Sequence, residues 1–184
     1  MAQRTWTLSN VISLSRVALL APLAYCLLTE FEHNREWAVG IVILGVLSDF
    51  LDGYLARKLH DVSELGKIID PLADKAAVGV LALLLVLLGD IPLWFFVVAV
   101  IRDLMILAGG IYIRRKKNII AQSNWPGKVA VNFIALYLLL SALQWESLEG
   151  LRTFALWASL AMMSLSLFVY TRRLFIGRAV ERGA

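Results

Sequence analysis

Four aspartates are the residues of this sequence whose type and spacing most clearly suggest chemistry. They are Asp49, Asp52, Asp70 and Asp74, and each stands beside or within a long apolar segment. Residues three or four apart share a face of an α-helix, so Asp49 with Asp52, and Asp70 with Asp74, would form one pair on each of two helices. Carboxylate oxygens are the donors that hard divalent cations prefer. The spacing therefore predicts a site for Mg²⁺ or Mn²⁺, which two ions could share.

Pairs of divalent ions are a recurring device of phosphoryl and nucleotidyl transfer, because they neutralise phosphate oxygens and stabilise the charge on a leaving group. Arg57 follows the first aspartate pair and suits phosphate binding. Gly53, Ala56 and Gly66 are small residues close to the acids, which leaves room for a bulky headgroup or a neighbouring helix. The pattern therefore predicts chemistry on a phosphate-bearing substrate.

A purely structural explanation of the same acids has to be weighed. Carboxylates at membrane depth can pair with cations only to orient helices, and Lys67, Lys75 and Arg57 are available partners. A single aspartate pair would fit that explanation as well as a functional one. Two pairs together with three small residues and an arginine fit it much less well, so we favour a functional site.

The elements that must position these acids are membrane helices. Hydrophobic residues make up 60% of the 184 residues and charged residues only 17%, which exceeds what the core of one soluble domain requires. A helix needs about 20 apolar residues to cross a hydrocarbon layer of about 30 Å. Six segments reach that length, near residues 11–29, 37–55, 71–89, 92–113, 128–145 and 152–170. The sequence predicts an all-α integral membrane protein with six transmembrane helices in a single domain, residues 1–184.

The distribution of charge predicts how the six spans are oriented. Clusters of lysine and arginine follow the second, fourth and sixth spans, whereas the other loops carry mainly acids. By the positive-inside rule both termini are then cytoplasmic, and the four aspartates lie at the cytoplasmic boundary of the membrane. No nucleic-acid motif accompanies these cations, so we expect no nucleic-acid partner. We also expect no cleavable signal peptide, because the first span carries Arg16 and lacks a clear small-residue cleavage site.

The two aspartate pairs form a longer motif that resembles the signature of a known family. Residues 49–74 contain D-x-x-D-G-x-x-A-R, eight further residues, and then G-x-x-x-D-x-x-x-D. This is similar to the signature of the CDP-alcohol phosphatidyltransferases, and every signature position is filled. The six-span layout and the segment Asn10–Arg16 also resemble the family, so the likeness extends over most of the chain.

The resemblance implies transfer of a phosphatidyl group from CDP-diacylglycerol to an alcohol, with release of CMP and two bound divalent ions. It implies that Asp49, Asp52 and Asp70 are metal ligands, and that Asp74 is both a ligand and the general base for the attacking hydroxyl. It assigns binding of the CDP-lipid to Gly53, Ala56, Arg57, Ser63 and Gly66. A homodimer surrounded by membrane lipid, in the bacterial cytoplasmic membrane, is the assembly and location that the resemblance suggests.

The acceptor alcohol is less clearly encoded than the donor. A cationic group in and after the fourth span offers a surface for a phosphate-bearing acceptor, and its candidate residues are Arg102, Arg114, Arg115 and Lys128. The positive-inside rule alone would also account for Arg114 and Arg115, and Arg102 with Asp103 could be a helix-packing pair. Within the family, phosphatidylglycerophosphate synthases often carry Arg-Glu in the fourth span and Gly-Lys-x-Lys-Thr at the start of the fifth.

This chain has Arg102-Asp103 and Gly127–Val131 at those places, and Arg-Asp is more similar to the cardiolipin synthases that use phosphatidylglycerol. On overall length and layout we expect glycerol 3-phosphate as the acceptor, with phosphatidylglycerol as the alternative and serine or inositol phosphate as further ones. A small divalent-metal transporter is the alternative of a different class, because facing acids also build ion pathways. A transporter would need polar residues along a whole route, whereas the third, fifth and sixth spans are almost wholly apolar past their cytoplasmic ends.

Overall fold

The computed structural model describes the backbone of residues 8–59, 66–117 and 125–176, and the side chains of residues 18–48, 75–110 and 125–172. All regular structure within these ranges is helical. In chain order the elements are α1 (Leu8–Leu28), α2 (Asn34–Leu59), α3 (Gly66–Leu87), α4 (Leu93–Lys117), α5 (Trp125–Leu143), the 3-10 helix η1 (Glu146–Leu148) and α6 (Glu149–Ile176). The prediction of an all-α protein is confirmed for this part of the chain.

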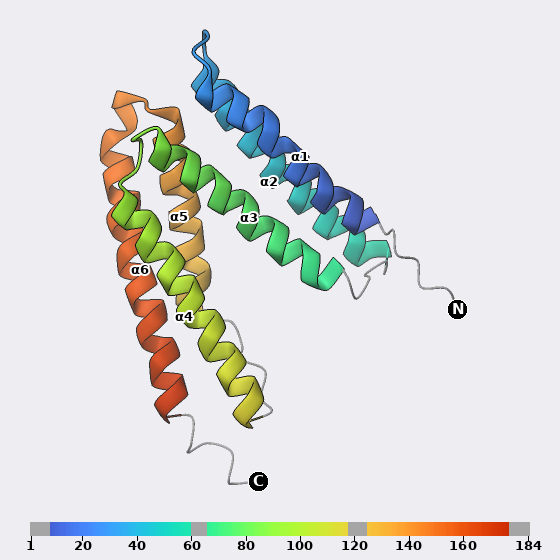
Figure 1. The fold of residues 1–184 in the computed structure, drawn as a ribbon, viewed down its shortest axis with the longest axis vertical. Coiled ribbons are helices and arrows are strands. Elements are labelled where there is room, and N and C mark those ends of the chain that lie inside the picture. The colour runs from blue at the N-terminus through green and yellow to red at the C-terminus, as the bar shows by residue number, and fades with distance from the viewer. Residues whose placement is uncertain (1–7, 60–65, 118–124, 177–184) are drawn as a thin grey trace. The chain divides into compact units, whose positions relative to one another are not determined.

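The chain forms two compact units, and α1 is the central helix of the first. This unit contains α1, α2 and α3 together with the short segment Ser141–Gln144. Helix α1 lies along both α2 and α3 (Figure 1). Aliphatic residues are buried in the unit, among them Leu23 and Leu27 of α1, Ala38 of α2 and Leu85 of α3. Because α1 packs against both of the helices that carry the aspartates, it links them into one bundle.

A left-handed turn at the end of α3 determines where Asp90 lies. Gly89 has a φ of +80°, and the backbone N–H groups of Gly89 and Asp90 donate to carbonyl oxygens of the last turn of α3 at 3.0 and 2.8 Å. This pattern is a Schellman motif, which glycine favours because it has no Cβ. The Asp90 side chain is only 3% exposed and forms an ion pair with Arg35 at the start of α2. It also accepts a hydrogen bond from Gln144.

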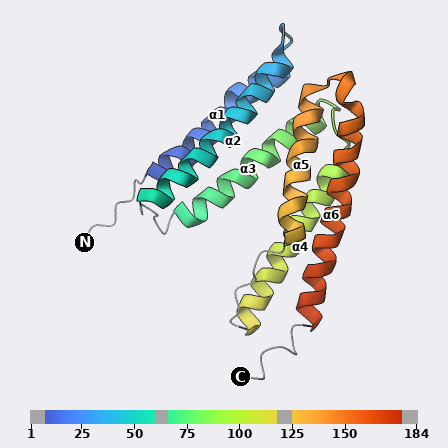
Figure 2. The same ribbon diagram turned by 180° about the vertical axis from the view of Figure 1, so that it is seen from behind.

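Aromatic and small residues form the core of the second unit, which contains α4, most of α5, η1 and α6. Phe95 of α4 and Tyr137 of α5 pack edge to face with ring centroids 4.7 Å apart. Phe133 of α5 packs in the same way against Phe154 of α6 at 6.1 Å. Helix α4 also packs along α6, and both can be followed from behind in Figure 2. Phe95 and Tyr137 are buried between the helices, whereas Phe154 is 59% exposed and lies at the edge of the bundle.

Three helices among the described residues are long and apolar enough to cross a membrane. They are Leu93–Gly110, Trp125–Leu143 and Glu146–Arg172, with mean hydropathies of 1.9, 1.6 and 1.6. Two further apolar segments, Ala18–Leu28 and Lys75–Leu87, are shorter. The three long segments coincide with the last three predicted spans. The total of six spans and their orientation stay predictions.

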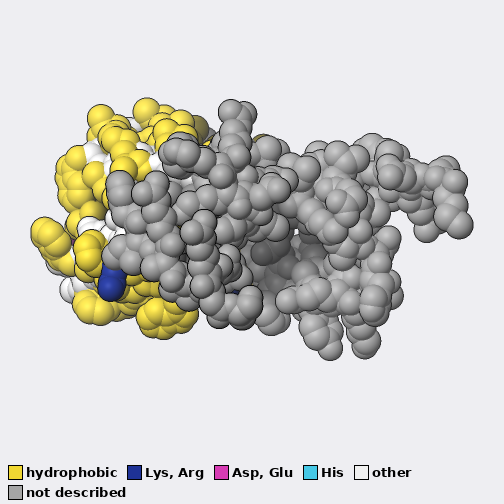
Figure 3. Space-filling view, turned by 90° about the horizontal axis from the view of Figure 1, so that it is seen from below, with side chains coloured by type: hydrophobic (Ala, Val, Ile, Leu, Met, Phe, Trp, Pro, Cys, Tyr) yellow, Lys and Arg dark blue, Asp and Glu magenta, His cyan; other side chains and the backbone are white. Residues whose placement is uncertain are grey.

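The outside of these helices is also apolar. Large side chains such as Leu87, Trp157 and Phe168 are exposed, and hydrophobic side chains make up most of the described surface seen in Figure 3. A soluble monomer rarely exposes so many large apolar residues, whereas lipid tails solvate them readily. The length of the helices and the character of their surface together identify a membrane protein.

Candidate functional site

The backbone of the first unit places the four aspartates on two consecutive helices. Asp49 and Asp52 lie in the second half of α2, and Asp70 and Asp74 lie in the first half of α3. At a rise of about 1.5 Å per residue, the α2 pair lies roughly 10–15 Å from the last residue of its helix, and the α3 pair roughly 6–12 Å from the first residue of its own. The end of α2 and the start of α3 are at the same end of the unit (Figure 1). The two pairs therefore lie at comparable depth.

Most of the residues predicted to bind the CDP-lipid lie on the same two helices, α2 and α3. Gly53, Ala56 and Arg57 lie in the last two turns of α2, and Gly66 begins α3. Ser63 lies outside the described residues, and the side chains of the aspartates and of the other signature residues lie outside the described side chains. The helical register is nevertheless what the predicted site requires, because each aspartate pair is separated by about one turn.

Four carboxylates near the same end of α2 and α3, two helices that both pack on α1, fit a hard divalent cation, since Mg²⁺ and Mn²⁺ prefer oxygen ligands. Among the side chains that the structure describes, no group of three or more histidine, cysteine or acidic residues is arranged to hold a metal ion. The four aspartates are not among these side chains. The donor set and the register of α2 and α3 are thus the observations that bear on a metal site.

Arg102 is the predicted acceptor residue with the clearest environment. It is 8% exposed, lies within α4, and donates from Nη1 to Oδ1 of Asp103 at 2.7 Å and from Nη2 to Oγ of Ser166 in α6 at 2.9 Å. Its Nε is buried without a hydrogen-bond partner. A buried guanidinium in an apolar helix is costly unless it is hydrogen-bonded. The bond to Asp103 stays within α4, whereas the bond to Ser166 links α4 to α6. The Nε–H group in particular is left for a ligand or a water molecule.

The other predicted acceptor residues lie at the ends of helices in the second unit. Arg114 and Arg115 occupy the last turn of α4, where their side chains are outside the described ones. Lys128 lies in the first turn of α5 and is exposed. Arg102 is therefore bonded to α6, whereas the Lys128 side chain is exposed and accessible to a ligand.

The sequence alone does not single out Ser166 as the partner of Arg102, since serines recur along α6. A signal was nevertheless present. Ser159 and Ser166 are seven residues apart, and both are fully buried. Small polar residues that repeat on one face of an apolar helix commonly mark a helix interface.

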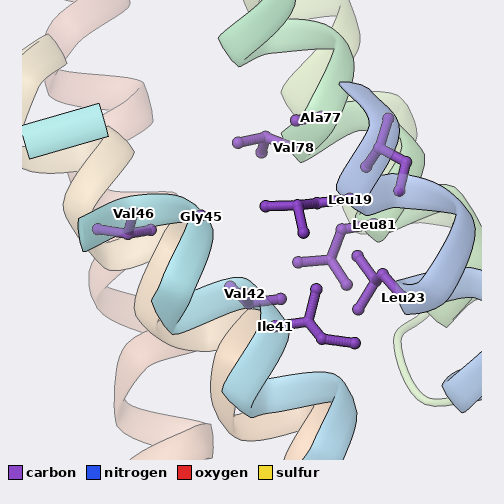
Figure 4. A pocket seen from close by; sticks show the side chains of 10 residues that line it. Leu19, Leu23, Ile41, Val42, Gly45, Val46, Ala77, Val78 and Leu81 are labelled. Atoms are coloured by element: carbon purple, nitrogen blue, oxygen red, sulfur yellow. The ribbon is translucent and has the colours of Figure 1, made fainter. Parts of the chain in front are cut away.

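The structure also contains an apolar cavity that the sequence did not suggest. It lies among α1, α2 and α3, has a volume of about 220 Å³ and is lined by ten residues, all of them aliphatic or glycine (Figure 4). Gly45 and Ala77, small residues within long apolar runs of α2 and α3, are among them. Small residues at these positions leave space between neighbouring helices.

Comparison with known proteins supports the resemblance seen in the sequence. A family model described as CDP-alcohol phosphatidyltransferase matches residues 6–165. The chain is 36% identical over 133 residues to a CDP-diacylglycerol–glycerol-3-phosphate 3-phosphatidyltransferase of Aquifex aeolicus. This alignment covers 71% of this chain and 72% of the relative. It is 34% identical over 113 residues to a cardiolipin synthase (CMP-forming) of Rattus norvegicus, in an alignment that covers 61% of this chain and 36% of the relative.

A third similar protein is a putative cardiolipin synthase of Mycobacterium tuberculosis, 34% identical over 106 residues, or 58% of this chain and 49% of the relative. The matches to the cardiolipin synthases of rat and Mycobacterium thus span about a third to a half of those proteins. Relatives that carry these two different enzyme names are similar to this chain at nearly the same level of identity.

Proposed function

Because this chain belongs to the CDP-alcohol phosphatidyltransferase family, we propose that it transfers a phosphatidyl group from CDP-diacylglycerol to an alcohol and releases CMP. The observation that carries the proposal is the complete signature on α2 and α3, with an aspartate pair at comparable depth on each helix. In the reaction the alcohol oxygen forms a bond to the phosphatidyl phosphorus. The bond between that phosphorus and CMP breaks, and the hydroxyl proton passes to a carboxylate.

We assign the aspartates on the basis of the family signature. Asp49, Asp52, Asp70 and Asp74 would bind two divalent ions, Mg²⁺ or Mn²⁺, which would neutralise the diphosphate and the charge that grows on the leaving CMP. Asp74 would in addition accept the proton of the attacking hydroxyl, since an alcohol is a poor nucleophile without a base in hydrogen-bond reach.

The remaining signature residues would hold the donor. Arg57 would bind phosphate oxygens of the diphosphate through its planar guanidinium. Gly53, Ala56 and Gly66 would let the nucleotide approach the helix backbones closely, and Ser63 would line the same pocket. Together these residues would orient the phosphorus relative to the attacking oxygen, which is a large part of catalysis in phosphoryl transfer.

Glycerol 3-phosphate is the acceptor that we propose first. The relative from Aquifex, whose name includes glycerol 3-phosphate, matches over most of both chains. Arg102 and the exposed Lys128 would supply cationic groups for a phosphate. Phosphatidylglycerol is the second candidate. The Arg102-Asp103 pair and the similarity to proteins named cardiolipin synthase favour it.

We further propose six transmembrane spans with both termini in the cytoplasm, a site on the cytoplasmic side of the bacterial cytoplasmic membrane, and a homodimer. The lysine and arginine clusters at the C-terminal ends of α2, α4 and α6 support this orientation. Single cysteines test it in a Cys26→Ser background, because Cys26 is the lone cysteine. A membrane-impermeant maleimide should label Glu32→Cys in cells with a permeabilised outer layer, and Lys116→Cys only after lysis. The reverse pattern would overturn the orientation.

The function is tested by CMP release from purified protein supplied with CDP-diacylglycerol and Mg²⁺ or Mn²⁺. Glycerol 3-phosphate, phosphatidylglycerol, serine and inositol 1-phosphate are offered separately. We expect CMP release with glycerol 3-phosphate, its loss with a chelator, and its recovery when either metal is restored. Release with phosphatidylglycerol alone would identify the second candidate. Metal movement across vesicles without CMP release under any condition would contradict the proposed chemistry and favour transport.

A further inference from the structure

The apolar cavity in the first unit continues the helix faces that carry the signature aspartates. Gly45 and Val46 line it from α2 and precede Asp49 by four and three residues. Ala77 and Val78 line it from α3 and follow Asp74 by three and four residues. Residues three or four apart share a helix face. The cavity therefore begins about one helical turn, roughly 5 Å, from the aspartates on both helices.

The lining of the cavity indicates the chemistry of its occupant. The other labelled residues of the wall in Figure 4 are Leu19 and Leu23 of α1, Ile41 and Val42 of α2, and Leu81 of α3. None of the ten lining side chains carries a polar group, so a phosphate, a nucleotide or a sugar would lose its hydrogen bonds there. A hydrocarbon chain would lose nothing. A stretch from Ile41 to Val46 corresponds to a length of roughly 8 Å, which suits a segment of an acyl chain.

We propose that this cavity holds the part of one acyl chain of CDP-diacylglycerol nearest its glycerol, while the aspartates hold the diphosphate. The inference rests on the proposed function. Continuity decides in favour of this occupant, because the donor is the one molecule that must place a diphosphate at the aspartates and hydrocarbon beside them. Since bilayer lipid is as apolar as the cavity wall, the cavity adds little hydrophobic free energy. Its effect is to orient the donor, and misplacement by about 1 Å can lower a rate by about a hundredfold.

Glycines of α2 allow a matched pair of variants. A Cβ at Gly45 would lie 3.9 Å from Cδ1 of Leu19, an ordinary contact, so the helix tolerates a side chain there and a long one would extend into the cavity. Gly40 is also in α2, does not line the cavity and has open space around the position of a Cβ. Gly45→Phe should therefore fill the cavity, and Gly40→Phe should leave it empty. Ala77→Phe, with Gly79→Phe as its control, repeats the test from α3.

The experiment uses CDP-diacylglycerol with a photoreactive diazirine near the glycerol end of one acyl chain, in vesicles of phosphatidylcholine. We expect cross-links on peptides of α1, α2 and α3 that line the cavity, and unlabelled CDP-diacylglycerol should compete for them. Gly45→Phe and Ala77→Phe should lower this labelling at least about fivefold, because an overpacked site excludes its ligand. The two control variants should be labelled like the unmodified protein.

Three results would overturn the inference. The label could fall mainly on other helices, it could persist in Gly45→Phe, or excess unlabelled CDP-diacylglycerol could fail to compete, which would indicate ordinary bilayer lipid. A change of Gly45→Phe from dimer to monomer with unchanged labelling would instead assign the cavity to a second copy of the chain. CMP release is measured on the same samples. Release without cavity labelling would retain the proposed function alone, and cavity labelling without release would retain the lipid site alone.

Discussion

Among single residues, Asp74 meets the largest chemical demand, because it is proposed both to bind a metal ion and to accept the hydroxyl proton. Asp74→Asn keeps the size of the side chain but removes the charge and most of the basicity. We expect CMP release to fall by at least about a hundredfold, the usual contribution of a general base. Glu149→Gln is the control, since Glu149 is an exposed acid paired with Arg152 at 2.9 Å. Near-normal CMP release by Asp74→Asn, in protein that elutes as the unmodified form does, would remove Asp74 from the mechanism.

Ser166 offers a second test at this scale, directed at stability. Ser166→Ala would remove the hydrogen bond at 2.9 Å to Nη2 of Arg102, whose Nε already lacks a partner. We expect a loss of about 1 kcal/mol, typical of hydrogen bonds between membrane helices. Ser164→Ala is the matched control, because Ser164 is exposed and donates to the carbonyl of Leu160 in its own helix. Thermal unfolding in detergent measures both, and equal midpoints would show that the bond adds nothing.

The contrast between these residues shows what the sequence could predict. The four aspartates could be proposed as a site from the sequence, because metal chemistry requires a given residue type at helical spacing and spacing is visible in a sequence; the site stays a prediction. The partner of Arg102 could not be found in this way. Ser166 lies 64 residues further along the chain, and which serine of α6 it is depends on how two helices cross.

At the scale of elements, the contact between α4 and α6 depends on a glycine. A Cβ at Gly109 would lie 2.7 Å from Cε1 of Tyr170, and the Tyr170 hydroxyl donates to the carbonyl of Ile106 at 3.0 Å. Gly109→Ala should therefore force the ring away and destabilise the protein by about 1–3 kcal/mol. At Gly110 the nearest atom, the Tyr170 hydroxyl oxygen, would be 3.4 Å away. Gly110→Ala should cost clearly less in the same thermal unfolding measurement, and equal losses would contradict this account of the interface.

The helices themselves were largely predictable, because long apolar runs in a membrane protein have few alternatives to helix. Their ends were not. Helix α2 runs from Asn34 to Leu59, beyond the predicted span at residues 37–55 on both sides. A hydropathy pattern marks the part of a helix that lies in lipid, whereas capping groups and turns decide where the helix begins and ends. The 3-10 helix η1 was not predicted for the same reason.

At the scale of the molecule, Asp90 connects distant parts of the chain. Asp90→Asn keeps a hydrogen-bonding side chain but leaves Arg35, whose side chain is 23% exposed, without its counter-ion. Breaking a buried pair costs about 3–5 kcal/mol, and partial exposure reduces our expectation to about 2 kcal/mol. Glu149→Gln, which breaks an exposed pair, should cost less than about 1 kcal/mol. Unfolding midpoints of the two variants provide the comparison, and similar values would mean that the Asp90 contacts contribute little.

Membrane residence and family could be predicted for the whole molecule because both depend on composition and on a local motif. The cavity among α1, α2 and α3 could not, since it depends on the space that side chains of three helices leave between them. Gly45 and Ala77 are informative only once their neighbours are known.

The three groups that meet at Asp90 are also made at different times. A ribosome completes Arg35 and Asp90 well before Gln144, which follows Asp90 by 54 residues. At about 5–20 residues per second, this interval lasts roughly three to ten seconds. During synthesis the ion pair between Arg35 and Asp90 can therefore join α2 to the end of α3 first. The amide of Gln144 can bond to Asp90 only after α5 has been made. Asp90 can thus pair with Arg35 early in synthesis, and it accepts the hydrogen bond from Gln144 once α5 is complete.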